Sequence, residues 1–547
     1  MNSPCAPLWE RNGPGLLICD LQTGYDYEYP MRRTILSNSP QQPSKVWRKV
    51  LLAFLLLGAC SSRACSSPEP ELQQPDVLFL VVDTLRADRL GSYGYERGLT
   101  PVMDRLAQEG AVFTRASSQA PWTVPSMCSM ITSQYPTAHF EYPEESRMTL
   151  AEAFQQAGYT TVGVVANALL DPGTGFERGF DVYIPREGTD GKRKMPGHFD
   201  AVASWADAAL VSALARDENG KRKPLFLYAQ PSDPHAPYHG RQAFLADQPV
   251  SSVPPILPEK WQEQMLGARG PAAPDDDPGW SMALQEIQRQ RNAYDHDVRF
   301  TDAALGRWLK RLEELGADNL LVVIASDHGE ELWENVTPAA ADRLKEMSPN
   351  AFFFQSHGYS LAEQALRTPI ILSGPGVPAG RKFAEPVENV DLFPTLVSLC
   401  GLERPDDLHG MDLTPLMQGR VERGDWRLET YSYVIHGFSM RDETSGLKLV
   451  LPTSYGMERG LSPPQLFDLS ADPLERTNLV EQRPKDASRL TKRMMQYLKR
   501  YDSDGTSVSK KKRAKLLKDL KENGYGGDLV GEDDEQEDDP GDEEGKP

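Results

Sequence analysis

The stretch Asp76-Val77-Leu78-Phe79-Leu80-Val81-Val82-Asp83 is an apolar run of strand length that ends in an acidic residue. A continuous run of this kind indicates a strand buried on both faces of a parallel sheet. An amphipathic helical pattern follows over 100–110 and closes at Gly110. We therefore expect 76–82 to be the first core strand of an α/β domain.

Further buried-strand patterns recur along the chain and alternate with helical patterns. These strand candidates are 160–165, 225–228, 320–325 and 369–372. The alternation predicts a doubly wound, mostly parallel sheet. From about residue 420 short alternating pieces precede a helix over 487–500, which predicts a smaller antiparallel C-terminal subdomain.

The composition excludes some classes of function. The chain has 547 residues and a formal net charge of -20, and ten of its acidic residues lie within 532–544. The remainder is only mildly acidic, so a basic face for nucleic acid is not expected. The six cysteines form no CxxC pair and no Cys/His cluster with zinc-finger spacing.

The N-terminal region has the pattern of an export signal. A basic segment, 45–49, precedes an apolar run over 50–57 that is too short to span a bilayer as a helix. The run ends in Leu57-Gly58-Ala59-Cys60, which resembles the lipobox of bacterial lipoproteins, with Cys60 as the lipidated residue. Met31 is the expected start of translation. An ordinary secretory signal or a buried helix is the alternative.

These patterns predict six segments. They are an extension over 1–30, a lipoprotein signal peptide over 31–59, a tether over 60–75, a catalytic domain over 76–419, the antiparallel subdomain over 420–502 and a largely disordered acidic tail over 503–547. The lipid anchor predicts an exported, membrane-attached protein of the bacterial envelope, with the outer membrane preferred.

Polar motifs follow three of the predicted strands directly. Asp83, Asp233-Pro234-His235 and Asp327-His328 stand at these positions. Ligands bind at the carboxyl ends of strands in open α/β sheets, so we expect the three motifs to converge. Thr123 lies just before a helix initiated by Pro125, where backbone N–H groups and the helix dipole favour an anion. Helix capping is the alternative role for Thr123 and Asp83.

The chain resembles the sulfatase family of the alkaline phosphatase superfamily over roughly 76–480. The resemblance rests on Asp83-Thr84-Leu85-Arg86-Ala87-Asp88, Gly91-Ser92-Tyr93-Gly94, Thr123-Val124-Pro125-Ser126, Ser326-Asp327-His328-Gly329-Glu330, His357-Gly358, Arg367-Thr368-Pro369, Val390-Asp391-Leu392-Phe393-Pro394-Thr395 and Leu466-Phe467-Asp468-Leu469. It implies an alkaline phosphatase-like fold, ester hydrolase activity, and one or two divalent metals held by carboxylates.

Carried over by position, Asp83, Asp327 and His328 match metal ligands, and Thr123 matches the nucleophile that lies against the metal. An imidazole among oxygen ligands favours zinc or manganese, while calcium remains possible. His235 matches an active-site histidine of the family. His357 stands where many sulfatases have a lysine, and a solvent-facing loop position is its alternative.

The nucleophile motif departs from that of a standard sulfatase. Sulfatases oxidise a Cys or Ser in Cys/Ser-x-Pro-Ser-Arg to formylglycine, whereas here Thr123 fills that slot and Met127 replaces the Arg. Cys128 cannot substitute, because the residues after it include neither the Pro nor the Arg. The segment 165–168 lacks the Lys and His of the family pattern. Thr123 would therefore act as a hydroxyl nucleophile.

We therefore expect a metal-dependent hydrolase of a phosphate ester or diester, with His235 or His357 moving the proton. The substrate would be a small-molecule, glycan or lipid ester. Three alternatives remain: a sulfuric ester hydrolase, a phosphoglycerol or phosphoethanolamine transferase, and an inactive binding lipoprotein. Glu330 and Glu331 are expected to cap or orient their loop rather than bind metal.

Overall fold

The protein is described by a computed structural model. It covers residues 74–136, 142–186, 197–238, 278–332, 357–358, 360–421, 424–434, 436–453 and 464–501. The predicted extension, signal peptide, lipidated Cys60 and acidic tail lie outside these residues. Within the described ranges, every helix is too short or too polar to cross a membrane.

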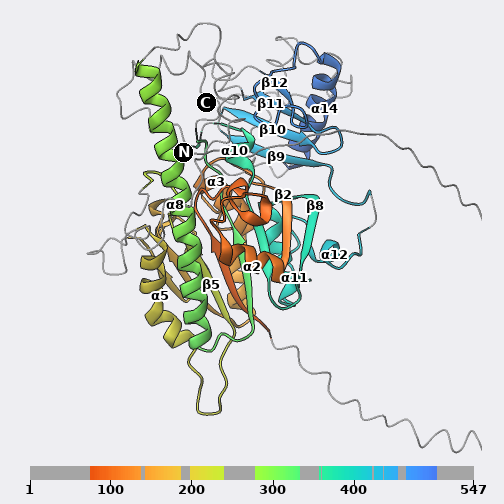
Figure 1. The fold of residues 1–547 in the computed structure, drawn as a ribbon. Helices are drawn as coiled ribbons and strands as arrows, with labels where there is room; N and C mark the ends of the chain where they lie inside the picture. Colours follow the sequence, from red (N-terminus) through yellow and green to blue (C-terminus); the bar gives the residue numbers. More distant parts are fainter. Residues whose placement is uncertain are drawn as a thin grey trace, which may run out of the picture. The chain divides into compact units, whose positions relative to one another are not determined.

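The main sheet has eight strands in the order β4-β3-β5-β1-β6-β7-β2-β8, with β1 near its middle. Figure 1 labels its strands β2, β5 and β8. The strands are β1 (Asp76–Val81), β2 (Ala111–Ser117), β3 (Thr160–Val165), β4 (Val182–Ile184), β5 (Leu225–Gln230), β6 (Leu320–Ala325), β7 (Ile370–Ser373) and β8 (Arg381–Glu388). Only β7 among them runs antiparallel to its neighbours β6 and β2. The predicted α/β fold with a mostly parallel sheet is confirmed.

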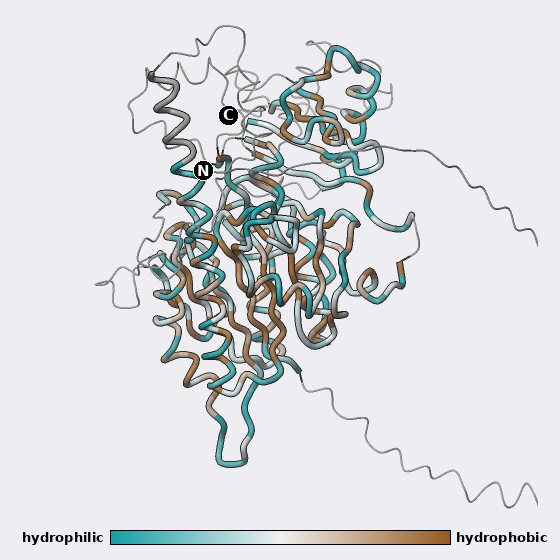
Figure 2. Tube along the Cα trace, in the orientation of Figure 1, coloured by the Kyte–Doolittle hydropathy of each residue, from teal (hydrophilic) through white to brown (hydrophobic). Residues whose placement is uncertain are grey.

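Strand β1 shows why an uninterrupted apolar sequence is needed at the centre of the sheet. Leu78 and Leu80 point into one hydrophobic core, and Val77 and Phe79 point into a second core on the opposite face. Successive side chains of a strand alternate between faces, so a strand covered on both sides needs apolar residues at every position. Hydrophobic residues are accordingly concentrated in the strands of this sheet (Figure 2).

Helices cover both faces of the main sheet. The first core includes residues of α2 (Pro101–Glu109), α5 (Phe199–Ala213) and α8 (Pro278–Glu314). The second includes residues of α3 (Thr123–Thr132), α4 (Leu150–Gln156), α11 (Leu392–Leu399) and α12 (Thr414–Met417). Shorter helical turns are η1 (Ala87–Arg89), η2 (Gly91–Tyr93), η3 (Ala168–Leu170), α10 (Glu363–Leu366) and η6 (Asn389–Asp391).

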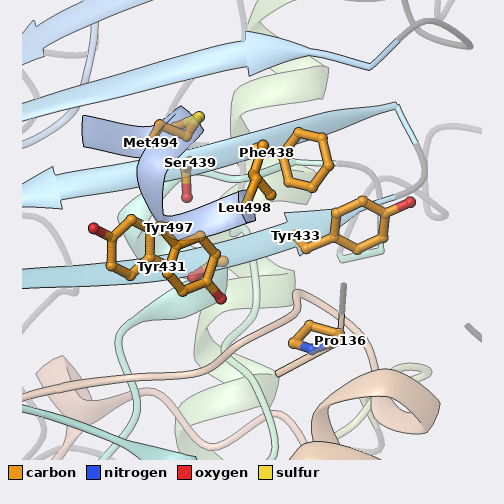
Figure 3. Close-up of a pocket in the computed structure, with 9 residues that line it drawn as sticks. Pro136, Tyr431, Tyr433, Phe438, Ser439, Met494, Tyr497 and Leu498 are labelled. Atoms are coloured by element: carbon orange, nitrogen blue, oxygen red, sulfur yellow. The ribbon is translucent and has the colours of Figure 1, made fainter. Parts of the chain in front are cut away.

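A second sheet follows in the chain and is entirely antiparallel, as predicted. Its order is β12-β11-β10-β9, with β9 (Glu429–Val434), β10 (Gly437–Asp442), β11 (Leu447–Pro452) and β12 (Gln465–Asp468). Helix α14 (Pro484–Tyr501) packs on it. The rings of Tyr431 and Tyr497 stack across this contact at 3.6 Å between centroids (Figure 3).

Candidate active site

The predicted site residues come together at one end of the main sheet, where its parallel strands have their carboxyl ends. All of them except His357 follow the carboxyl end of a strand that runs in the common direction. Asp83 follows β1, Thr123 follows β2, Asp233 and His235 follow β5, and Asp327 and His328 follow β6. The topology alone therefore places these side chains at one end of the sheet, where ligands bind in open α/β folds.

Asp83, Asp327 and His328 form a buried cluster. Their side chains are 1% exposed or less. His328 Nε2 lies 3.5 Å from Asp327 Oδ2 and 3.8 Å from Asp83 Oδ1. One ligand atom from each of the three residues lies within 4.8 Å of the others. This spacing suits three ligands of a single metal ion.

Main-chain contacts fix the orientation of the cluster. The backbone N–H groups of Thr84 and His328 donate to Asp327 Oδ1, at 3.2 and 2.9 Å. His328 Nδ1 lies 2.9 Å from the Gly329 carbonyl oxygen, which can only accept, so Nδ1 carries the proton. The lone pair is then on Nε2, which faces the two carboxylates. A ring nitrogen oriented in this way is typical of a metal-ligating histidine.

Thr84 adopts a strained backbone conformation to make its contact. Its φ is +58°, in the left-handed region that residues branched at Cβ avoid. Such a conformation costs about 1–3 kcal/mol, and it persists when neighbouring contacts impose it. Here it turns the chain directly after Asp83, so that the Thr84 N–H reaches Asp327.

The electrostatics of the cluster call for a cation. Burial raises the pKa of Asp83 to about 7, and burial together with Asp83 raises the pKa of Asp327. Burial and the neighbouring His357 lower the pKa of His328, which keeps the ring neutral. Asp83 Oδ1 has no hydrogen-bond partner in the described part of the chain. Two buried carboxylates and a neutral imidazole fit a divalent metal, which would stabilise their charged forms.

Thr123 is the first residue of α3, and its side chain is 3% exposed. Its hydroxyl does not cap the helix but lies 3.4 Å from His328 Nε2. The Ser126 hydroxyl, one turn further along α3, donates to the Asp327 carbonyl and so attaches the helix to the metal-binding loop. The capping alternative is therefore wrong for Thr123, and its hydroxyl lies beside the candidate metal ligands.

Asn167 is a site residue that the sequence reading missed. It follows β3, and its Nδ2 donates to Asp83 Oδ2 at 2.9 Å and to Thr123 Oγ1 at 3.2 Å. The sequence showed only that the family's Lys and His are absent from 165–168. The single amide links a candidate metal ligand to the candidate nucleophile.

Three histidine rings lie side by side at the site. The centroid of His357 lies 4.6 Å from that of His328 and 4.8 Å from that of His235. His357 Nδ1 lies 2.9 Å from Glu330 Oε1, and although burial disfavours its cation, this carboxylate raises the pKa of His357 to about 9. The solvent-facing alternative for His357 is wrong, because its side chain is only 17% exposed and faces the site.

The other histidine has a different environment. Burial and the nearby His357 lower the pKa of His235. Its Nδ1 is bonded to the Ala236 carbonyl oxygen, which leaves Nε2 for proton transfer. The site thus combines a neutral imidazole with a cationic one, and Glu330 orients His357 rather than joining the candidate metal ligands.

A pocket of about 450 Å³ opens onto these residues. Its lining includes Asp83, Thr123, Asn167, Asp233, His235 and His357, together with Trp122, Leu169 and Arg186. This volume lies within the range of small-molecule sites. The nucleophile candidate is therefore accessible to a substrate although its side chain is almost fully buried.

Family models match most of the chain. The model described as sulfatase matches residues 75–402. The model described as N-sulphoglucosamine sulphohydrolase, C-terminal, matches residues 356–504.

Curated relatives and solved structures agree with this match. A sulfatase of Formosa agariphila is 26% identical over 442 residues, covering 70% of this chain and 80% of the relative. A choline-sulfatase of Rhizobium meliloti is 25% identical over 464 residues, covering 76% and 85%. The structure of a phosphonate monoester hydrolase of Agrobacterium radiobacter aligns with a TM-score of 0.55 at 19% identity, covering 79% of this chain and 97% of that one. That last likeness concerns the fold.

Proposed function

From the premise that this chain belongs to the sulfatase family and is an ester hydrolase of that family, we propose that it hydrolyses phosphate esters, diesters foremost, with Thr123 as the covalent nucleophile. The position of the Thr123 hydroxyl carries the proposal. It lies at the N-terminus of helix α3, between the Asn167 amide and His328 Nε2. Two buried carboxylates lie beside it.

Formylglycine, the aldehyde residue of sulfatases, has no precursor residue at position 123 of this chain. Thr123 replaces the Cys or Ser that is oxidised, and Met127, in place of the Arg, is fully buried in α3. Cys128 is 4% exposed, and burial raises its thiol pKa to about 12, which makes it a poor nucleophile. A hydroxyl attack by Thr123 is the chemistry that these residues retain.

The first step forms an ester to Thr123. After the hydroxyl proton has passed to solvent, the Thr123 oxygen bonds to phosphorus while the bond to the leaving oxygen breaks. The Asn167 amide stabilises the charged nucleophile by its hydrogen bond. His357, which Glu330 keeps cationic through its Nδ1, donates the proton of its Nε2 to the leaving oxygen. The products are an alcohol and a phosphoryl group on Thr123, which keeps the second ester group when the substrate is a diester.

The second step restores the enzyme. Water bonds to phosphorus and gives a proton to the imidazole that had lost one, while the bond to Thr123 breaks. The Thr123 oxygen then regains a proton from solvent. A divalent metal held by Asp83, Asp327 and His328 would lower the pKa of the Thr123 hydroxyl and offset the charge of the phosphoryl oxygens.

The test compares three substrates on matched variants. Methyl aryl phosphodiester, aryl phosphate and aryl sulfate are assayed with the wild-type protein, Thr123→Ala, Thr123→Ser and the neighbouring helix variant Thr132→Ser. We expect Thr123→Ala to lower phosphodiester turnover by on the order of 10⁴-fold. Thr123→Ser and Thr132→Ser should remain active. Unchanged phosphodiester turnover by Thr123→Ala would refute the proposal.

Sulfate ester hydrolysis is the second candidate, since curated relatives with 25–26% identity are named sulfatase and choline-sulfatase. Phosphonate monoester hydrolases among structures of the same fold show that this scaffold also hosts phosphorus chemistry. If aryl sulfate were the best substrate in the same assay, sulfate ester hydrolysis would replace phosphate ester hydrolysis as the proposed activity.

We also propose that the protein is exported and anchored to the bacterial envelope through a lipid on Cys60, with a membrane-associated glycan, lipid or small-molecule ester as its substrate. The basic segment, the short apolar run and the terminal cysteine support this proposal. Labelled palmitate should be incorporated into the wild-type protein and not into Cys60→Ala. Equal labelling of both would exclude the anchor.

A further inference from the structure

Arg186 differs from the other charged residues of the catalytic pocket. It is the only lysine or arginine among the described residues that line the pocket, and it is exposed there. Its backbone N–H donates to Asp171 Oδ1 at 3.2 Å. Its guanidinium, however, makes no hydrogen bond or ion pair with any described residue. An unpaired guanidinium in a substrate pocket is suited to bind an anionic group.

The position of Arg186 separates it from the reacting centre. It follows β4, which lies three strands away from β1 in the order β4-β3-β5-β1. Neighbouring strands are about 4.8 Å apart, so the end of β4 lies about 14 Å from the end of β1 and from Asp83. The flexible arginine side chain can span part of that distance, which leaves room for about one ring between its guanidinium and the metal ligands.

Apolar side chains line the same pocket. Trp122, directly before Thr123, is half-buried there, and Leu169 in η3 is 43% exposed although it is a large hydrophobic residue. An exposed leucine and an indole ring that line the same pocket provide a surface for the apolar face of a sugar or aromatic ring. The pocket therefore offers, in addition to the reacting centre, a ring surface and a distant cation.

We propose that the substrate is a ring-bearing ester with a second anionic group, a carboxylate, sulfate or phosphate, which is not the group being transferred. Arg186 binds this second anion, and Trp122 and Leu169 contact the ring. Sulfated or uronate-containing saccharides and acidic aryl esters have this chemistry. The inference rests on the proposed function, because it deepens the specificity of the same site.

The experiment uses two esters that differ in one charge. The methyl phosphodiesters of 3-hydroxybenzoate and 3-hydroxybenzamide have the same ring and linkage. The ratio of their kcat/KM values is measured for the wild-type protein, Arg186→Gln and Arg186→Lys. Arg105→Gln, which changes an exposed arginine on α2 outside the pocket, is the matched control. Dividing the ratio of each variant by that of the wild type cancels the difference between leaving groups.

We expect Arg186→Gln to lower the carboxylate-to-carboxamide ratio about tenfold, equivalent to about 1.4 kcal/mol, through a higher KM for the carboxylate ester. Arg186→Lys should retain most of the preference, and Arg105→Gln should retain all of it. Trp122→Ala should raise KM for both esters alike, because a ring contact does not sense the charge. The same ratio in Arg186→Gln as in the wild type would overturn the inference.

A second readout separates this inference from the proposed function. Calorimetric titration of Thr123→Ala with each ester compares their affinities without turnover, and Thr123→Ala combined with Arg186→Gln should lose the preference for the carboxylate. A preference that depends on Arg186 in a protein whose turnover survives Thr123→Ala would refute the nucleophile and support the anion site. Equal affinities of Thr123→Ala for both esters would refute the anion site and leave the nucleophile standing.

Discussion

Two buried clusters of charged residues in this molecule differ in one respect. In the first, Lys448 on β11 lies 2.9 Å from Glu363 and 2.8 Å from Glu475, and Arg441 lies 2.7 Å from Glu363. In the second, the carboxylates of Asp83 and Asp327 have only the neutral ring of His328 among them. The first cluster contains its own cations, whereas the second has only the neighbouring His357, whose charge does not outweigh burial at Asp83.

The pKa values express the difference. Burial opposes ionisation of Glu363, but Lys448 and then Arg441 outweigh it and lower its pKa to about 2. Burial dominates at Asp83 and raises its pKa to about 7. At Glu475 in the same cluster as Glu363, burial outweighs Lys448 and raises the pKa, so the internal cations fully compensate only one of the two glutamates. Buried acids without a cation among them indicate a place for an external one.

The clusters are also connected. Glu363 is the first residue of α10, and the carbonyl oxygens of Gln364 and Ala365 accept from the N–H groups of Glu330 and Gly329. The paired cluster therefore holds the loop that contains Asp327 and His328. The ion pairs beside the C-terminal sheet therefore help to keep Asp327 and His328 in position.

The largest effect on stability is expected where an internal cation is removed. Lys448→Met leaves Glu363 and Glu475 buried without their shared partner, and should lower the free energy of unfolding by about 3–5 kcal/mol. Urea denaturation measures the change. The control is Arg307→Gln, which breaks an exposed pair with Asp200 and should cost less than about 1 kcal/mol. Equal effects of the two substitutions would invalidate the comparison.

The stability contributed by the second cluster, Asp83, Asp327 and His328, should instead depend on bound metal. Chelation should lower the melting temperature, and zinc or manganese at 100 times its dissociation constant should restore about 2.7 kcal/mol of stability. Asp83→Asn should lose this response without being destabilised in the chelated state, because it removes a buried charge that the Asn167 amide compensates only in part and keeps an oxygen for that hydrogen bond. A metal response that survives Asp83→Asn would place the ion elsewhere.

A smaller effect is expected at the amide that joins ligand and nucleophile. Asn167→Ala removes hydrogen bonds to Asp83 and Thr123 and should lower kcat about ten- to a hundredfold, with little change in unfolding. Asn219→Ala, on an exposed loop, is the control. Wild-type kcat in Asn167→Ala would show that this amide does not assist the nucleophile.

The smallest effect concerns the strained residue beside the site. Thr84 combines a positive φ with a buried hydroxyl that has no hydrogen-bond partner within the described ranges. Thr84→Gly should raise the free energy of unfolding by up to about 1 kcal/mol, because the relief of strain exceeds the entropy that glycine adds to the unfolded chain. Thermal denaturation measures it. A loss of stability would show that the methyl packing of Thr84 matters more.

The sequence was sufficient for elements whose signal is local. The apolar run of β1 and the acidic residue after it predicted both a central strand and a site residue. The run 320–325 and Asp327 did the same for β6, whereas Thr123 was assigned from its place before a helix and from the family resemblance. The roles of these residues stay predictions until they are measured. Helix α8 was missed, because its charged residues obscure the apolar stripe that faces the core.

Contacts between distant segments could not be predicted. Asn167 reaches Thr123 only because β3 lies beside β5 on the same side of β1, and no local pattern encodes that order. Arg186 follows a three-residue edge strand whose sequence is too short to stand out. Glu330 and His357 are 27 residues apart, and no local pattern encodes their pairing.

The most direct test of the account is intact-mass analysis of protein quenched during turnover of a methyl aryl phosphodiester, followed by peptide mapping. We predict the mass of one phosphodiester-derived group on the peptide that contains Thr123, and none in Thr123→Ala. Steady turnover with an unmodified Thr123 peptide, or with the same adduct on another residue, would contradict the account.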